Sequence, residues 1–311
     1  MKKISVIVPC YNEQESLQLL YQELCRLMKA ESKYEWEILF VNDGSKDDTL
    51  QVIQSLSAQD ASVSYIDLSR NYGKETAMLA GFDYAQGDAC VIMDADLQHP
   101  PMVVRDMLRK WEEGYDDVYG KRTTRAKESW LRKCLSYAFY YILQKSAKVD
   151  VLPNVGDFRL LDRKCIDALR QMRETDRYTK GLYCLIGFRK TYVEFETQDR
   201  VSGSSSWTLR GLIALAIEGI MSFTIAPLRM ATWVGGITAA GAFLYALYFL
   251  IKTLVVGDPV HGFPTLVILI LFFGGAQLLA LGVLGEYVGR IFRESKHRPN
   301  YFVQTYYSAK K

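Results

Sequence analysis

Two long stretches without a charged side chain lie near the C-terminal end of the 311-residue chain. Residues 231–251 make up about 21 positions and residues 263–285 about 23. As helices, both are long enough to cross a hydrocarbon core of ~30 Å. Two buried core helices would give the same pattern, but uncharged helices rich in glycine are rare in soluble domains. We therefore expect a two-helix transmembrane anchor over residues 231–289.

Basic side chains flank these stretches. Arg229 precedes the first, and the second is followed by Arg290, Arg293, Lys296 and Arg298. Because basic flanks stay on the cytoplasmic side, we expect the N-terminal domain and both termini to face the cytoplasm. Just before the anchor, residues 207–230 have a broad apolar face with few charges, as in a helix that lies in the membrane interface; an ordinary core helix would also fit. The expected divisions are a cytoplasmic domain (1–206), an interfacial helix (207–230), the anchor (231–289) and a cytoplasmic tail (290–311).

The N-terminal domain alternates short apolar runs with stretches of helical periodicity. The expected strands are 4–8, 37–41, 63–68 and 89–93, and the expected helices are 15–28, 47–56 and 73–85. This order continues to about Tyr119 and predicts an α/β fold with a doubly wound, mainly parallel sheet. Residues 156–160 and 189–196 read as two further strands.

Two carboxylates, Asp94 and Asp96, come directly after the apolar run 89–93. Ligands of open α/β sheets bind at the carboxyl ends of the strands, and hard oxygen ligands there suit Mg²⁺ or Mn²⁺ with a substrate phosphate. A turn or a helix cap would also use this pair, but the buried strand before it favours a metal–diphosphate site. A G-x-G-x-x-G fingerprint does not follow the first strand, and the chain has no Walker loop. Phosphates would therefore be neutralised by a metal.

Charge and cysteine content exclude several other classes of protein. The net charge of +3 does not indicate a nucleic-acid binder, and the six cysteines have no C-x-x-C spacing. We therefore expect reduced thiols and no zinc site. We interpret His99 as a loop residue, because a single histidine does not make a metal set.

Four motifs stand at the ends of the first four strands: Pro9-Cys10-Tyr11-Asn12-Glu13, Asn42-Asp43-Gly44-Ser45, Ser69-Arg70-Asn71-Tyr72-Gly73-Lys74-Glu75 and Asp94-Ala95-Asp96-Leu97-Gln98. Gly156-Asp157-Phe158-Arg159-Leu160 and a glycine-rich ending from Gly282 to Arg290 extend the pattern. In these motifs the chain resembles family-2 glycosyltransferases, and within them the polyisoprenyl-phosphate glycosyltransferases. These include the dolichol-phosphate mannose synthases and the bactoprenol glucosyltransferases. Two spans with this ending are most similar to the bacterial bactoprenol enzymes.

The resemblance implies a GT-A-type nucleotide-sugar domain, a divalent metal (Mg²⁺ or Mn²⁺) and sugar transfer with inversion. It places the enzyme in the bacterial inner membrane as a multi-pass protein and is compatible with a homotetramer. The residues that it implies around the nucleotide are Pro9, Tyr11, Asn12, Glu13 and Asp43. For the metal and the sugar diphosphate it implies Asp94, Asp96 and Gln98.

One loop departs from the family pattern. Arg-x-x-Gly-x-Ser/Thr-Lys is usual there, but in this chain Ser206 stands in place of the lysine. Phosphate binding would then rest on Arg200 alone, or on Lys74, Arg122 or Arg125.

The chemistry of a lipid-phosphate acceptor indicates which residues would bind it. A phosphate monoester has a second pKa of about 6, so the nucleophile is already an anion at neutral pH and needs no strong base. It does need cations, and a guanidinium matches phosphate geometry, which favours Arg122 and Arg200. We expect Asp157 to bind a sugar hydroxyl; a role as base, or a structural ion pair with Arg159, stays open.

The function predicted from the sequence is transfer of a hexose, with glucose from UDP-glucose favoured, onto undecaprenyl phosphate. GDP-mannose, UDP-GlcNAc and UDP-galactose stay open as donors, because a few hydroxyl contacts separate them. A processive polysaccharide synthase is disfavoured because the chain lacks a Gln-x-x-Arg-Trp motif. A membrane protein that binds nucleotide sugars without catalysis is the remaining alternative. The sequence does not identify the downstream glycan.

Overall fold

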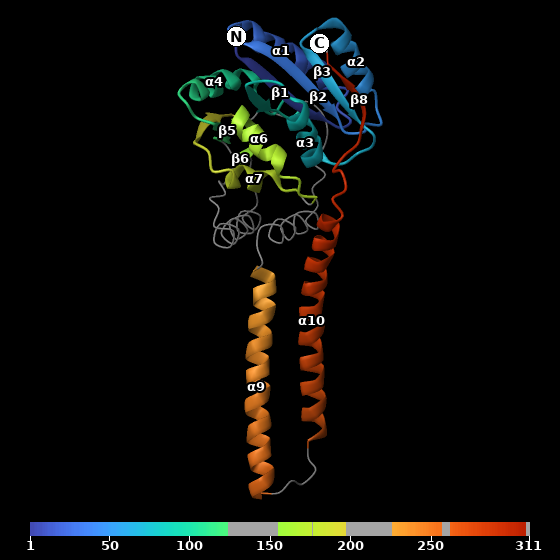
Figure 1. Cartoon of the computed structure of the whole chain (residues 1–311), viewed down its shortest axis with the longest axis vertical. Helices are drawn as coiled ribbons and strands as arrows, with labels where there is room; N and C mark the ends of the chain where they lie inside the picture. Colours follow the sequence, from blue (N-terminus) through green and yellow to red (C-terminus); the bar gives the residue numbers. More distant parts are fainter. Residues whose placement is uncertain (124–154, 176, 197–225, 257–261, 309–311) are drawn as a thin grey trace. The chain divides into compact units, whose positions relative to one another are not determined.

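The structure is a computed structural model that describes residues 1–123, 155–175, 177–196, 226–256 and 262–308. The chain divides into two compact units (Figure 1). One comprises Met1–Ile213 together with Arg298–Lys311, and the other is Ala214–His297. The second unit is therefore an insertion in the sequence of the first.

The first unit is built on an eight-stranded mixed sheet in the order β7-β5-β6-β4-β1-β2-β3-β8. The strands are β1 (Lys3–Cys10), β2 (Glu35–Asn42), β3 (Val63–Leu68), β4 (Ala89–Ile92), β5 (Asp117–Arg122), β6 (Val155–Asp162), β7 (Lys190–Phe195) and β8 (Val303–Tyr307). The predicted strands are all present. The central four, β3-β2-β1-β4, are parallel, as expected.

Beyond β4 the sheet differs from the expected parallel order. Strand β6 pairs antiparallel with both β4 and β5, so it separates two strands that are consecutive in the chain. Phe158, Leu160 and Leu161 of β6 are fully buried, which suits a central strand covered on both faces. Apolar periodicity identifies such a strand but not its neighbours or its direction, which is why this arrangement was not predicted.

Side-chain alternation along β1 assigns the helices to the two faces of the sheet. Ile4, Val6 and Val8 belong to the core cluster that contains α1 (Leu17–Ala30), α2 (Thr49–Gln59) and α4 (Val104–Glu112). Ile7 points the other way and contacts Gly81 of α3 (Lys74–Tyr84). Helix α6 (Arg163–Gln171) packs beside α3 (Figure 1). This two-sided covering leaves the carboxyl ends of β1, β2 and β4 open for a site.

The C-terminal residues differ from the expected tail. Val303–Tyr307 forms β8, which pairs antiparallel with β3 at the edge of the sheet. Just before it, the Tyr301 hydroxyl donates a 2.5 Å hydrogen bond to Asp83 of α3. The ring of Tyr307 stacks on Tyr65 at a centroid distance of 5.5 Å. A five-residue edge strand has too weak a pattern to be identified from the sequence, because half of its side chains face solvent.

The second unit contains two long helices, α9 (Ala226–Val256) and α10 (Phe263–Ser295). Both uncharged stretches are therefore helical, as predicted. Among the described residues, one helical segment, Phe272–Ser295, is long and apolar enough to cross a membrane; the apolar segment of α9, Met230–Tyr245, is shorter. Most of the expected interfacial helix, residues 207–225, lies outside the described residues.

Candidate active site

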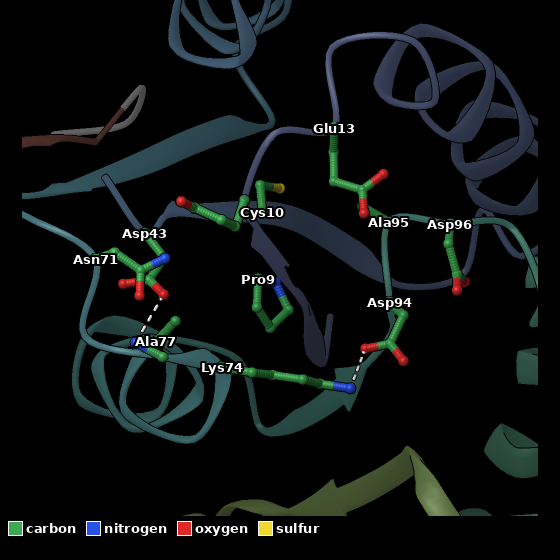
Figure 2. Close-up of a pocket in the computed structure, with 12 residues that line it drawn as sticks. Pro9, Cys10, Glu13, Asp43, Asn71, Lys74, Ala77, Asp94, Ala95 and Asp96 are labelled. Carbon is green, nitrogen blue, oxygen red and sulfur yellow. Dashed lines mark hydrogen bonds and ion pairs between the residues drawn. The ribbon is translucent and has the colours of Figure 1, made fainter. Parts of the chain in front are cut away.

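A cleft of about 340 Å³ lies at the carboxyl ends of β1, β2 and β4, beside the first turn of α3 (Figure 2). This volume is within the range of small-ligand sites. The predicted residues that line it are Pro9, Tyr11, Glu13, Asp43, Lys74, Asp94 and Asp96. The motifs after these strands, which are distant in the sequence, therefore converge as expected.

Asp43 holds the loop that leads into α3. Its carboxylate accepts hydrogen bonds from the backbone N–H groups of Tyr72 (2.7 Å) and Gly73 (2.8 Å). Burial raises the pKa of Asp43, and these two hydrogen bonds oppose that rise. Gly73 has a φ of 91° and Gly44, next to Asp43, a φ of 62°. Both positions favour glycine, and a Cβ on Gly44 would collide with the backbone of Arg70 and Asn71.

Asn12 contributes to the loop after β2 rather than to the cleft wall. Its backbone N–H donates to Ser45 Oγ at 3.0 Å, and its side-chain oxygen accepts from the backbone N–H of Lys46 at 2.8 Å. The residue adopts a φ of 56°, a conformation that Asn tolerates better than most residues. The structure therefore places Asn12 as a brace between the loops after β1 and β2, not among the cleft-lining residues.

Lys74 joins two carboxylates from different strands. Its Nζ lies 2.6 Å from Asp94 Oδ1 and 3.0 Å from Asp157 Oδ2. A dashed line in Figure 2 marks the first of these ion pairs. Burial opposes the charged form of Lys74, but Asp94 and Asp157 raise its pKa above the usual value. Burial likewise raises the pKa of Asp157, but the ammonium groups of Lys74 and Lys180 outweigh it and hold that pKa below its usual range. Lys74 and Asp157 therefore form a charged pair in the site.

Asp157 extends from β6 and is 8% exposed. Lys74 contacts only one of its carboxylate oxygens; the other, Oδ1, is buried without a hydrogen-bond partner among the described residues. Buried carboxylate oxygens normally have a partner. The arrangement fits a carboxylate that accepts a hydrogen bond from a substrate hydroxyl. The pairing with Arg159 considered from the sequence is not found, because Arg159 instead bonds Asp117 at 3.0 Å.

Three potential metal-ligating atoms, one each from Asp94, Asp96 and His99, lie within 4.8 Å of one another. The backbone N–H of Gln98 donates to Asp96 Oδ1 at 3.1 Å, which fixes the orientation of that carboxylate. Gln98 itself is not among the residues that line the cleft. The two carboxylates supply the hard oxygen donors that Mg²⁺ and Mn²⁺ prefer. The residues therefore fit a divalent ion.

His99 is the site residue that the sequence interpretation missed. It is 2% exposed and stacks on Phe158 of β6 at a centroid distance of 4.8 Å. Its Nε2 lies 3.5 Å from Nη2 of Arg122, the exposed residue that ends β5. Burial lowers the pKa of His99. The sequence around His99 does not indicate that the ring is buried, because the residues that enclose it belong to strands far away in the sequence. Arg200, Arg125 and Ser206 lie outside the described residues.

Residues 5–170 match the family described as Glycosyl transferase family 2. The chain belongs to this family. This glycosyltransferase is 41% identical over 302 residues to the bactoprenol glucosyl transferase of Shigella phage SfV, which covers 97% of this chain and 98% of that protein. It is 42% identical over 301 residues to the putative glycosyltransferase CsbB of Bacillus subtilis, with 97% and 91% covered. The resemblance predicted from the motifs is confirmed.

Solved structures with a similar fold include a glucosyl-3-phosphoglycerate synthase from Mycobacterium tuberculosis, crystallised with Mn²⁺, UDP and phosphoglyceric acid. It is 18% identical, with a TM-score of 0.48, and the match covers 70% of this glycosyltransferase and 75% of that chain. The family match and the mixed sheet agree with the GT-A-like α/β fold that was predicted.

Proposed function

We propose that this family-2 glycosyltransferase moves a glucosyl group from UDP-glucose to undecaprenyl phosphate, with inversion, at the cytoplasmic face of the bacterial inner membrane. The observation that carries the proposal is the match, over 97% of the chain, to proteins named bactoprenol glucosyl transferase. That match includes the long C-terminal helices as well as the domain with the cleft.

The cleft supports a nucleotide-sugar donor. Tyr11 is 42% exposed and offers a ring face for the base, while Glu13 and Asp43 supply acceptors for the base and ribose. Asp94 and Asp96, with Gln98, would hold Mg²⁺ or Mn²⁺ beside the diphosphate. When bound, such an ion stabilises as a Lewis acid the negative charge that builds on the leaving nucleotide.

The remaining charged residues would bind the transferred sugar and the acceptor phosphate. We assign Asp157 to a sugar hydroxyl, because a carboxylate whose pKa is held low is a poor proton acceptor but a good hydrogen-bond acceptor. Lys74 keeps the two carboxylates at its Nζ from repelling each other. Arg122, together with Arg200, would bind the acceptor phosphate, which approaches as an anion and needs a guanidinium more than a base.

We also propose that both long helices cross the membrane as the anchor of residues 231–289, preceded by the interfacial helix of residues 207–230. Helix α9 has 31 residues and α10 has 33. Ile237, Phe243 and Leu278 are each about 70% exposed within their unit, which is unfavourable in water and favourable in lipid. These apolar faces also offer surface for a homotetramer, with which the family resemblance is compatible.

The proposal is tested by incubating membranes that contain the protein with undecaprenyl phosphate and a panel of radiolabelled UDP- and GDP-sugars. We expect label in the organic-extractable lipid from UDP-glucose, dependent on added lipid phosphate and lost with EDTA. Label from another donor, such as UDP-galactose or GDP-mannose, would retain the reaction and replace the sugar. Tight UDP binding with no labelled lipid from any donor would instead support a nucleotide-sugar-binding protein without catalysis.

A further inference from the structure

His99 lies between the two parts of the site. On one side, a ligating atom of its ring is within 4.8 Å of the carboxylate oxygens of Asp94 and Asp96. On the other, its Nε2 is 3.5 Å from the guanidinium of Arg122. Asp94 and Asp96 belong to the donor end of the cleft. Arg122 was assigned above to the acceptor phosphate. A single buried ring therefore connects the two ends.

The ring of His99 is held in one orientation by an aromatic cage. Phe158 stacks on it with an interplanar angle of 15°, and Phe195 of β7 meets it edge-on at a centroid distance of 5.7 Å. Gly120 of β5 makes room for these two rings. A Cβ there would lie 2.7 Å from Phe195 and 2.8 Å from Phe158. Residues from three strands therefore hold the imidazole in place. A solvated loop residue would not be enclosed in this way.

The direction of the contact with Arg122 follows from hydrogen-bond chemistry. A guanidinium has donors only, so Nε2 of His99 must be the acceptor and the ring hydrogen must be on Nδ1. Nδ1 is buried without a partner among the described residues. The 3.5 Å distance between Nη2 of Arg122 and Nε2 of His99 is at the long end for a hydrogen bond.

We propose that His99 is a positioning residue that orients Arg122 toward the carboxylate pair, so that the acceptor phosphate is held facing the donor. Arg122 is exposed, and a long side chain at the surface has many rotamers. A hydrogen bond to Nε2 of His99, which is held in place, reduces the number of Arg122 rotamers before the phosphate binds. The inference rests on the proposed function, because it takes Arg122 as the ligand of the acceptor phosphate.

The test is a double-mutant cycle with His99→Phe, Arg122→Ala and the double variant, in the full-length protein in membranes. Phenylalanine keeps an aromatic ring in the cage and removes the acceptor nitrogen. We expect His99→Phe to raise the KM for undecaprenyl phosphate roughly tenfold, as for one lost hydrogen bond to a charged group, with the KM for UDP-glucose unchanged. The double variant should match Arg122→Ala alone, because the two residues act as one unit. His99→Gln, which retains an acceptor, should restore much of the lipid affinity.

Mn²⁺ titration of the same variants, followed by electron paramagnetic resonance, gives a readout independent of activity. We expect Mn²⁺ affinity to be unchanged in His99→Phe. Weakened Mn²⁺ binding would make His99 a metal ligand, and losses that add in the double variant would show that His99 acts independently of Arg122. Either result would overturn the inference. A wild-type lipid KM in His99→Phe would also overturn it. If Arg122→Ala itself leaves the lipid KM unchanged, the assignment of Arg122 in the proposed function is wrong. If His99→Phe does not fold, a raised lipid KM in His99→Gln would count against the inference.

Discussion

At the scale of single residues, the site contains oppositely charged side chains that come from different parts of the sheet and its helices. The Lys74 ammonium contacts Asp94 at 2.6 Å and Asp157 at 3.0 Å. Asp94 and Asp157 would therefore each lose an ion pair if mutated, which mixes structural and functional effects. Asp96, whose Oδ1 accepts a hydrogen bond from the backbone N–H of Gln98, is the carboxylate changed in the test of the proposed metal site.

Asp96→Asn is expected to lower transfer by about 100-fold or more, because an amide replaces a charged ligand of the divalent ion where leaving-group charge is stabilised. The melting temperature should stay close to that of the wild type. Radiolabel transfer and thermal unfolding measure the two effects. Asp106→Asn, an exposed carboxylate on α4 that pairs with Arg109, serves as the control and should change neither. Wild-type turnover in Asp96→Asn would exclude this residue from the site.

The pH dependence of transfer distinguishes the roles considered for Asp157. The rate should fall as the pH drops through about 6, because the acceptor phosphate gains its second proton there. Lys74 and Lys180 keep the pKa of Asp157 below its usual range, so this carboxylate is ionised well below that pH. In Asp157→Asn we therefore expect a lower rate with the same acidic limb. A flat profile in the variant would show that Asp157 itself is the titrating base.

At the scale of elements, two loops interlock beneath the nucleotide part of the cleft. The loop after β2 carries Asp43, whose carboxylate accepts from the backbone of the loop after β3 at Tyr72 and Gly73. Gly44 allows the close approach, and Asn12 braces the first of these loops from β1. The position of Asp43 thus depends on backbone geometry more than on side-chain packing.

Gly44→Ala is expected to weaken UDP binding and to destabilise the fold by about 1–2 kcal/mol, since alanine disfavours a positive φ and its Cβ would push the loops apart. Calorimetry with UDP and urea unfolding measure the two effects. Gly187→Ala is a matched control: its φ is 68°, but a Cβ there has 3.9 Å to its nearest neighbour. It should show the strain without the loss of UDP affinity. Equal UDP affinity in both variants would argue against the interlock.

The elements also show how much could be predicted from the sequence. The first four strands and the motifs at their ends were located correctly, because buried parallel strands are continuous apolar runs and their ends meet at one edge. The insertion of β6 and the edge strand β8 were not predicted, because pairing partners leave no periodic signal. The burial of the loop residue His99 was not predicted for a similar reason: Phe158 and Phe195, which enclose it, are about 60 and 100 residues away in the sequence.

At the scale of the whole molecule, the chain leaves the domain that carries the cleft, forms two long apolar helices and returns to the same domain. The unit Ala214–His297 is flanked on both sides by parts of the first unit. The returning segment is held by β8 and by Tyr301, which bonds Asp83. The two long apolar helices and the domain that carries the cleft are therefore connected at both ends of the helical unit.

Full-length protein is expected to stay in the membrane pellet after alkaline carbonate extraction, which removes peripheral proteins. Leu278→Arg should increase the extracted fraction, because an arginine near the middle of a spanning helix costs about 3 kcal/mol of insertion free energy. Leu278 is 71% exposed in its unit. Leu19→Arg, on the exposed side of α1, is the control and should behave as wild type. Complete extraction of the unmodified chain would contradict a spanning anchor.

The pairing of β8 with β3 has a consequence for proteolysis. A protein anchored by a terminal helix is released from its membrane by one cut. Here a single cut between α9 and α10 would leave the C-terminal fragment attached through its backbone hydrogen bonds to β3. The fragments would remain together until the sheet unfolds. With the anchor proposed above, release of the intact domain from the membrane would need two cuts, one on each side of the inserted helices.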